Sequence, residues 1–184
     1  MLTVQLKQLL VRARREELVN GRIAAQTFSK SEKEALIRLG YLRKAGTNLE
    51  LTDAGRRKVK VVLTGGVFDL LHLGHVYTLE KARKLGDLLV VVVAHDSTVR
   101  RLKGRPPLHT ARERAELLGK LRCVDVALVG DAKDRNAVLR RVKPDLVVFG
   151  YDQKADARLH AKIRKLKERL KGKAFKTSKI VEGI

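Results

Sequence analysis

A chain of 184 residues with 44% hydrophobic and 33% charged residues is long enough for one α/β domain plus a small one, and too apolar to stay disordered. Its single cysteine, Cys123, excludes an intramolecular disulfide and a cysteine-based zinc site. The net charge of +21 favours nucleotides, nucleic acid or anionic lipid, although basic surfaces are also common in thermophilic proteins. Without a signal-peptide pattern or a bilayer-length apolar run, we expect a cytoplasmic protein with no membrane partner.

The first 58 residues predict a small domain that begins with helices. Apolar residues recur at near-helical spacing, and the Asn-Gly pair at 20–21 indicates that the first helix stops there. Ser31 and Glu34 have the spacing of a capping box, which predicts the start of a second helix. Gly40 is expected to end that helix.

Two short strands are expected next, at residues 41–44 and 49–52, and they form a basic hairpin. Helices followed by such a hairpin resemble a small α+β winged helix-turn-helix domain, and the resemblance covers residues 1–58. It implies DNA binding, with Arg43 and Lys44 as candidate phosphate contacts. A domain used for dimerisation or packing, with a solvated basic face, is the alternative. We also expect the chain to form a homodimer.

Residues 59–184 show short apolar runs that alternate with helical segments. Strands are expected at residues 61–63, 88–94, 124–129 and 146–149, and a last segment begins at Phe175. Helices are expected at residues 76–85, 110–121, 137–142 and 156–170, the second of them capped by Thr110 and Glu113. The alternation predicts an α/β fold with a doubly wound, five-stranded, Rossmann-like parallel sheet, in which ligands bind at the carboxyl ends of the strands.

A glycine-rich turn directly follows the first strand of this second domain. His72 and His75 stand three residues apart at the entrance of a helix that is expected to begin near Gly74, which puts both imidazoles on one side. The glycines let backbone N–H groups approach a ligand, and the positive end of the helix favours phosphate. Two imidazole donors there suit nucleotidyl transfer, because negative charge spreads over the α-phosphate oxygens in the transition state.

This string resembles the signature Gly-x-Phe-Asp-x-x-His-x-Gly-His of the cytidylyltransferase-like nucleotidyltransferase superfamily, and every fixed position is present. The resemblance covers residues 58–184 and implies that His72 and His75 are catalytic, with an NTP and the divalent cation Mg²⁺ as partners. It also implies a nucleotide pocket formed by Gly66, Val67, Phe68, Asp69 and Gly74. Whether Asp69 holds the metal ion or orients a lysine stays open.

Three basic residues further along match the superfamily less sharply. By resemblance, Arg114 faces the phosphates of the NTP, while Lys103 and Arg105 lie in a proline-stiffened loop that closes over the substrate phosphates. Lys103 then belongs to the catalytic group, and Arg105 contacts the substrate phosphate. From the residues alone, an exposed helix charge at position 114 and a plain surface loop are the competing interpretations.

The end of the fourth strand carries Gly150, Asp152 and Gln153 in a Gly-Tyr-Asp-Gln string that resembles archaeal FAD synthases, which join AMP from ATP to FMN. The resemblance places these residues near the nucleotide base, and a turn cap is the alternative for Asp152. Thr177 and Ser178 resemble the superfamily's late phosphate motif, without its usual upstream arginine. The chain also lacks the paired C-terminal cysteines frequent in the archaeal enzymes.

The leading hypothesis is therefore an FMN adenylyltransferase that converts ATP and FMN into FAD and pyrophosphate. The alternative in the same class is a CTP-dependent enzyme acting on glycerol 3-phosphate or another small phosphorylated alcohol. An alternative of another class is a nucleotide-sensing regulator, which would show salt-dependent DNA affinity without pyrophosphate release.

Overall fold

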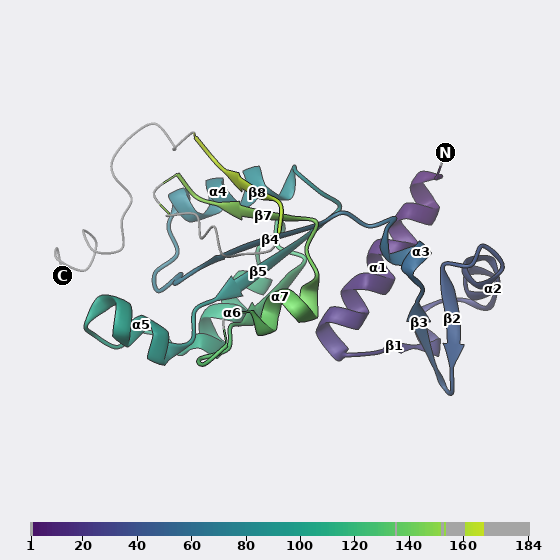
Figure 1. The fold of residues 1–184 in the computed structure, drawn as a ribbon, viewed down its shortest axis with the longest axis horizontal. Helices are drawn as coiled ribbons and strands as arrows, with labels where there is room; N and C mark the ends of the chain where they lie inside the picture. Colours follow the sequence, from purple (N-terminus) through teal and green to yellow (C-terminus); the bar gives the residue numbers. More distant parts are fainter. Residues whose placement is uncertain (1, 135, 152, 154–160, 168–184) are drawn as a thin grey trace. The chain divides into compact units, whose positions relative to one another are not determined.

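The computed structural model describes residues 2–134, 136–151, 153 and 161–167 (Figure 1). The chain forms two compact units, Met1–Lys60 and Val61–Ile184, whereas the sequence pattern changes between residues 58 and 59. Across the described residues, no helix combines the length and apolar character that crossing a membrane requires.

The first unit packs helices against a small antiparallel sheet with the strand order β1-β3-β2. Leu10 and Leu18 of its first helix and Leu36 of its second are fully buried, so the leucine spacing seen in the sequence does form the core. The elements are α1 (Val4–Asn20), β1 (Ile23–Ala24), a 3-10 turn (Ala25–Thr27), α2 (Lys30–Arg38), β2 (Leu42–Ala45), β3 (Asn48–Leu51) and α3 (Asp53–Arg56).

The start of α2 corrects one sequence prediction. The capping box is formed by Ser29 and Glu32, not by Ser31 and Glu34: the Glu32 N–H donates to the Ser29 hydroxyl, and the Ser29 N–H donates to the Glu32 carboxylate. Both pairs have the same spacing, so the pattern alone does not separate them. The earlier start leaves Phe28 in an extended conformation with its ring buried, which anchors the chain entering the helix.

The second unit contains the predicted five-stranded parallel sheet, with the order β6-β5-β4-β7-β8. The valine-rich β5 is its most buried strand, as its continuous apolar pattern predicts. The strands are β4 (Val61–Gly66), β5 (Leu88–Val93), β6 (Val126–Val129), β7 (Leu146–Phe149) and β8 (Ile163–Lys165). The helices are α4 (Leu73–Arg83), α5 (Asp96–Lys103), α6 (Ala111–Gly119) and α7 (Ala137–Val142).

The strand order reverses next to β4, because the chain proceeds from β4 through β5 to β6 on one side and then returns to β7 on the other. Helices α4 and α6 share a core with Val62 and Val91 on one face of the sheet. Leu63 and Val92 point to the opposite face, where Leu139 of α7 lies beside them. The carboxyl ends of β4 and β7 therefore form the switch point at which this fold binds ligands.

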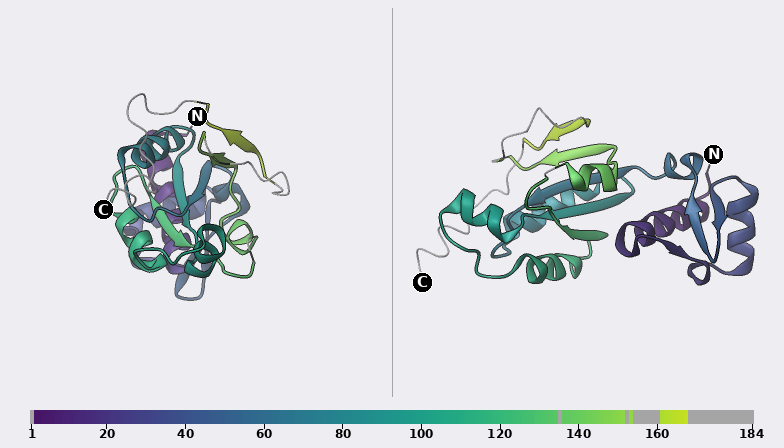
Figure 2. Two further views of the ribbon diagram at one scale, coloured as in Figure 1. Left: turned by 90° about the vertical axis from the view of Figure 1, so that its left-hand side faces the viewer. Right: turned by 60° about the horizontal axis from the view of Figure 1, so that its bottom comes forward.

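Two segments differ from the sequence prediction. Lys103 is the last residue of helix α5, which stands off the carboxyl edge of the sheet (Figures 1 and 2), and not part of a loop. The helix expected at residues 156–170 is wrong at its centre, because residues 163–165 form β8 and pair with β7. A three-residue edge strand is too short to show an alternating pattern. Asp152, Thr177, Ser178 and the segment from Phe175 lie outside the described residues.

Gly55 provides a test of the packing in the first unit. A Cβ atom at Gly55 would lie 2.3 Å from the backbone oxygen of Tyr41, so Gly55→Ala must push α3 away from the hairpin. We expect the free energy of unfolding, measured by urea denaturation, to fall by about 1–3 kcal/mol. Gly119→Ala is the matched control, because nothing lies within 4 Å of its added Cβ. Equal stability of the two variants would contradict this packing.

Candidate functional site

The glycine turn after β4 has a strained conformation with a specific packing cause. Phe68 adopts a left-handed backbone conformation with φ of 53°, which is rare for a residue with a side chain, and its ring is buried. A Cβ atom at Gly66 would lie 3.0 Å from two atoms of that ring. The Phe68 ring thus folds back over Gly66 and leaves little room for a side chain there, and this turn sends the chain towards α4.

His72 and His75 meet at the entrance of α4. His72 is the residue before the first turn of the helix, and the two imidazole rings stack with their centroids 3.8 Å apart and their planes 21° apart. The edge of the Phe68 ring contacts His75, with the centroids 5.1 Å apart. The structure thus brings together the two histidines, the phenylalanine and the amino end of an 11-residue helix, whose dipole favours an anion.

Asp69 is buried, and both of its carboxylate oxygens serve the segment that follows α5. The Leu108 N–H donates to Oδ1 at 2.7 Å, and Nη1 of Arg105 donates to Oδ2 at 3.2 Å. Within the described ranges, no group of three or more histidine, cysteine or acidic side chains has the geometry of a metal site. Through these two hydrogen bonds Asp69 ties Arg105 and Leu108 to the glycine turn.

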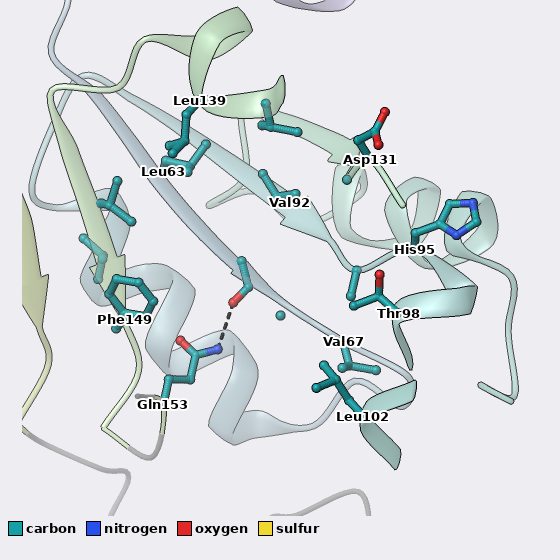
Figure 3. Close-up of a pocket in the computed structure, with 17 residues that line it drawn as sticks. Leu63, Val67, Val92, His95, Thr98, Leu102, Asp131, Leu139, Phe149 and Gln153 are labelled. Atoms are coloured by element: carbon teal, nitrogen blue, oxygen red, sulfur yellow. Dashed lines mark hydrogen bonds between the residues drawn. The ribbon is translucent and has the colours of Figure 1, made fainter. Parts of the chain in front are cut away.

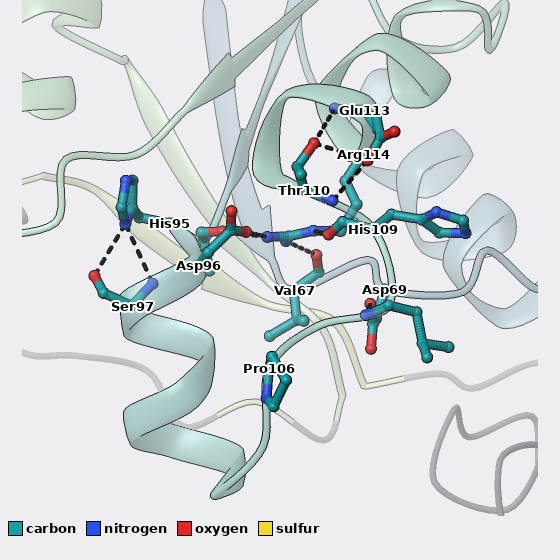
Figure 4. Close-up of polar contacts among 12 residues, drawn as sticks. Val67, Asp69, His95, Asp96, Ser97, Pro106, His109, Thr110, Glu113 and Arg114 are labelled. Atoms are coloured by element: carbon teal, nitrogen blue, oxygen red, sulfur yellow. Dashed lines mark hydrogen bonds and ion pairs between the residues drawn. The ribbon is translucent and has the colours of Figure 1, made fainter.

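Arg114 is buried, unlike the exposed helix charge that the residues alone allowed as an alternative. Its side chain is 1% exposed and donates four hydrogen bonds to protein acceptors (Figure 4). The acceptors are the backbone oxygens of Val67, Ala94 and His109, at 2.5, 3.0 and 2.9 Å, and the carboxylate of Asp96, at 2.5 Å. These bonds use four of the five N–H groups of a guanidinium, so the Arg114 side chain positions the segments around it.

Lys103 and Arg105 are more exposed to solvent than Arg114. Lys103 is exposed at the end of α5, and Gly104 ends that helix in a left-handed conformation with φ of 70°. The Arg105 side chain is 39% exposed while it pairs with Asp69, so its guanidinium keeps access to solvent beside the glycine turn.

Gln153 bridges the ends of β4 and β7 at the switch point. Its Nε2 donates to the backbone oxygen of Gly65 at 2.8 Å, and its Oε1 accepts from the N–H of Gly150 at 2.8 Å. The side-chain amide therefore joins the ends of the two strands. Gly150 and Gln153 lie together at the carboxyl edge, as their place in the sequence implies.

A pocket of about 570 Å³ opens on the face of the sheet opposite α4 and α6 (Figure 3). It begins at the backbone of the glycine turn and extends under α7. His95 and Asp131 line it, although neither was singled out in the sequence. The signal that could have found them is their position, since each comes directly after the carboxyl end of a strand, β5 or β6.

The two residues are held by local hydrogen bonds. Nδ1 of His95 accepts from the Ser97 N–H at 3.3 Å and caps α5. Oδ1 of Asp131 accepts from the N–H groups of Lys133 and Asp134, at 2.7 and 2.8 Å. These two donors, that of Asp134 first, hold the pKa of the Asp131 carboxyl below its ordinary value, so Asp131 is ionised at neutral pH.

Comparison with known proteins assigns this fold and site to a family. A family model described as cytidylyltransferase-like matches residues 63–181. A protein named FAD synthase from Pyrococcus abyssi is 41% identical over 142 residues, which cover 71% of this chain and 95% of the relative. Another FAD synthase, from Thermoplasma volcanium, is 48% identical over 106 residues, 57% of this chain and 74% of the relative.

A solved structure is also similar to this chain. It is described as the crystal structure of the lipopolysaccharide core biosynthesis protein from Thermoplasma volcanium, and it superposes with a TM-score of 0.55 at 40% sequence identity. The match covers 59% of this chain and 96% of the solved one.

The buried hydrogen bonds of Arg114 give a prediction for stability. Lysine cannot reproduce a planar fork of donors, so Arg114→Lys leaves several buried acceptors unpaired. We expect the free energy of unfolding, measured by urea denaturation, to fall by about 3 kcal/mol. The exposed Arg112 on the same helix is the control, and Arg112→Lys should leave stability unchanged. An equal effect of the two changes would show that the Arg114 contacts contribute little.

Proposed function

Since this chain belongs to the cytidylyltransferase-like family and is a nucleotidyltransferase, we propose that it is an FAD synthase, which transfers AMP from ATP to FMN and releases pyrophosphate. The observation that carries the proposal is the match to archaeal FAD synthases over nearly their whole length. The stacked histidine pair at the amino end of α4 supplies the matching chemistry.

In the proposed reaction, a phosphate oxygen of FMN attacks the α-phosphorus of ATP. The bond from that phosphorus to the oxygen bridging to the β-phosphate breaks, and pyrophosphate leaves with the electron pair. Charge builds on the α-phosphate oxygens, where His72 and His75 donate hydrogen bonds alongside the dipole of α4. The backbone of Gly66, Val67 and Phe68 lines the triphosphate path.

The basic residues divide between two roles in this proposal. Arg105, held by Asp69 and still open to solvent, contacts a substrate phosphate, and the exposed Lys103 approaches from the end of α5. Arg114 has a positioning role, because it donates a hydrogen bond to the backbone oxygen of Val67 in the glycine turn. Magnesium, as the counter-ion of ATP, would be held mainly by phosphate oxygens and water, while each oxygen of Asp69 already accepts one hydrogen bond.

The substrate assay tests the proposal directly. ATP or CTP is paired with FMN, glycerol 3-phosphate, phosphoethanolamine or phosphopantetheine, and pyrophosphate release is measured. We expect release with ATP and FMN, accompanied by FAD. Release with CTP alone would instead support the cytidylyltransferase alternative.

The histidine pair gives the corresponding prediction for variants. His72→Ala and His75→Ala should each lower kcat with ATP and FMN by about a hundredfold or more, because each removes a donor to the transition state. His109→Ala is the control: the residue is exposed, and only its backbone oxygen contacts Arg114. Near-normal turnover of both site variants would refute the mechanism.

For residues 1–60 we propose a winged helix domain that binds DNA. The order of helix, strand, helix and hairpin and the sheet order β1-β3-β2 support this. Lys44 is exposed on the hairpin, whereas Arg43 pairs with Glu50 at 2.7 Å, so Lys44 is the stronger candidate for a phosphate contact. The domain would then add DNA binding to the enzyme, and a homodimer would pair two such domains.

Fluorescence anisotropy with a labelled duplex checks the DNA proposal. Affinity should fall steeply as salt rises, and Lys44→Glu should weaken binding by several-fold. Lys133→Glu, an equal charge change on the exposed surface of the second unit, should have a smaller effect. An equal loss for both variants would indicate a diffuse effect of net charge. Absence of binding at low salt would favour a packing role for the domain.

A further inference from the structure

The pocket beside the glycine turn has a different character at each end. Leu63, Leu139 and Phe149 surround one end, while His95 and Asp131 lie at the other (Figure 3). Among the described residues that line the pocket, the ones with hydrogen-bonding side chains are His95, Thr98, Asp131 and Gln153. The amide of Gln153 is occupied by Gly65 and Gly150. A ligand that fills this pocket therefore needs an apolar end and a polar end.

Glycines keep much of the floor between the two ends low. A Cβ atom at Gly65 would lie 3.2 Å from the backbone oxygen of Val92, and one at Gly130 would lie 3.3 Å from Cγ1 of the same valine. Gly65, Val92 and Gly130 sit on three neighbouring strands or their ends, and of these three residues Val92 alone adds a side chain to the floor. Such a floor suits a planar ring system.

The pocket is also continuous with the phosphate site. Gly65, Gly66 and Val67 line it, and the same turn leads to His72 and His75. A planar group in the pocket, joined by a flexible chain to a phosphate, can therefore place that phosphate at the turn. FMN has this construction: a three-ring isoalloxazine, a ribityl chain and a terminal phosphate.

We propose that this pocket binds the isoalloxazine ring of FMN, with the dimethylbenzene end beside Leu139 and Phe149 and the pyrimidinedione edge facing His95 and Asp131. The proposal rests on the proposed function and adds the acceptor's binding site to it. Adenine fits less well, because it has ring nitrogens on both of its rings and no apolar end.

The two polar residues match the pyrimidinedione edge in donor and acceptor character. Nδ1 of His95 accepts from the Ser97 N–H, which leaves Nε2 available to donate to a ring carbonyl. The ionised Asp131 has Oδ1 occupied by its own loop, and its Oδ2 accepts from the N3–H of the flavin. His95 thus offers a donor to the ring carbonyl, and Asp131 offers an acceptor to the neighbouring N–H of the same edge.

The test measures FMN and ATP binding separately, in the full chain and without turnover. Quenching of flavin fluorescence gives the Kd for FMN, and calorimetry gives the Kd for ATP. Leu139→Trp, which fills the apolar end, and Asp131→Asn, which keeps the loop hydrogen bonds through Oδ1, should each raise the FMN Kd about tenfold or more. The ATP Kd should stay within twofold. Asp134→Asn, in the same loop but outside the pocket lining, is the control.

An N3-methylated FMN sharpens the test of Asp131. The wild-type protein should bind it about tenfold more weakly than FMN, and Asp131→Asn should reduce that preference to less than about threefold. Unchanged FMN binding in both variants would overturn the proposal, as would a loss of ATP binding with FMN binding intact, which would assign the pocket to adenine. If the wild type binds FMN in this pocket but forms no FAD from ATP, the proposed function fails by itself.

Discussion

The nucleotide-binding edge of this protein depends on one buried cation. The Arg114 guanidinium joins the glycine turn, the end of β5, the start of α5 and the loop before α6 through its four hydrogen bonds. A guanidinium removed from water is costly unless its donors are satisfied. One side chain therefore links the four segments. The position of Val67 depends on this residue, which contacts no substrate in the proposed reaction.

The reversal of strand order determines which elements lie on each face of the sheet beside that cation. It leaves α4, with the histidine pair, on one face of the sheet and the open pocket on the other, and the glycine turn is common to both. Two substrates that must meet at one phosphorus atom can thus approach from opposite faces. Gln153 keeps the two strand ends at a fixed separation where the substrates would meet.

The sequence predicted the parallel sheet, the starts of α4, α6 and α7 and the meeting of His72 and His75, because apolar runs, caps and glycines have strong local signatures. It did not predict β8, which is short and lies at an edge, or the capping residue of α2, for which two serines had equal spacing. The sequence could not predict the burial of Arg114, because that burial depends on acceptors distant along the chain, Val67 and Ala94. His95 and Asp131 were missed because the pocket that they line forms only when β5 and β6 lie side by side.

The contact between Gly66 and Phe68 has a consequence for how the signature string can vary. The phenylalanine ring occupies the space that any side chain at position 66 would need, and the same ring supports His75. The two positions therefore form an energetically coupled unit, in which the effects of separate substitutions do not add. A smaller residue at position 68 would make an alanine at position 66 tolerable, but it would also withdraw the lateral support from one imidazole. An alanine at position 66 therefore requires the Phe68 ring to shift, and any such shift is passed on to the neighbouring imidazole.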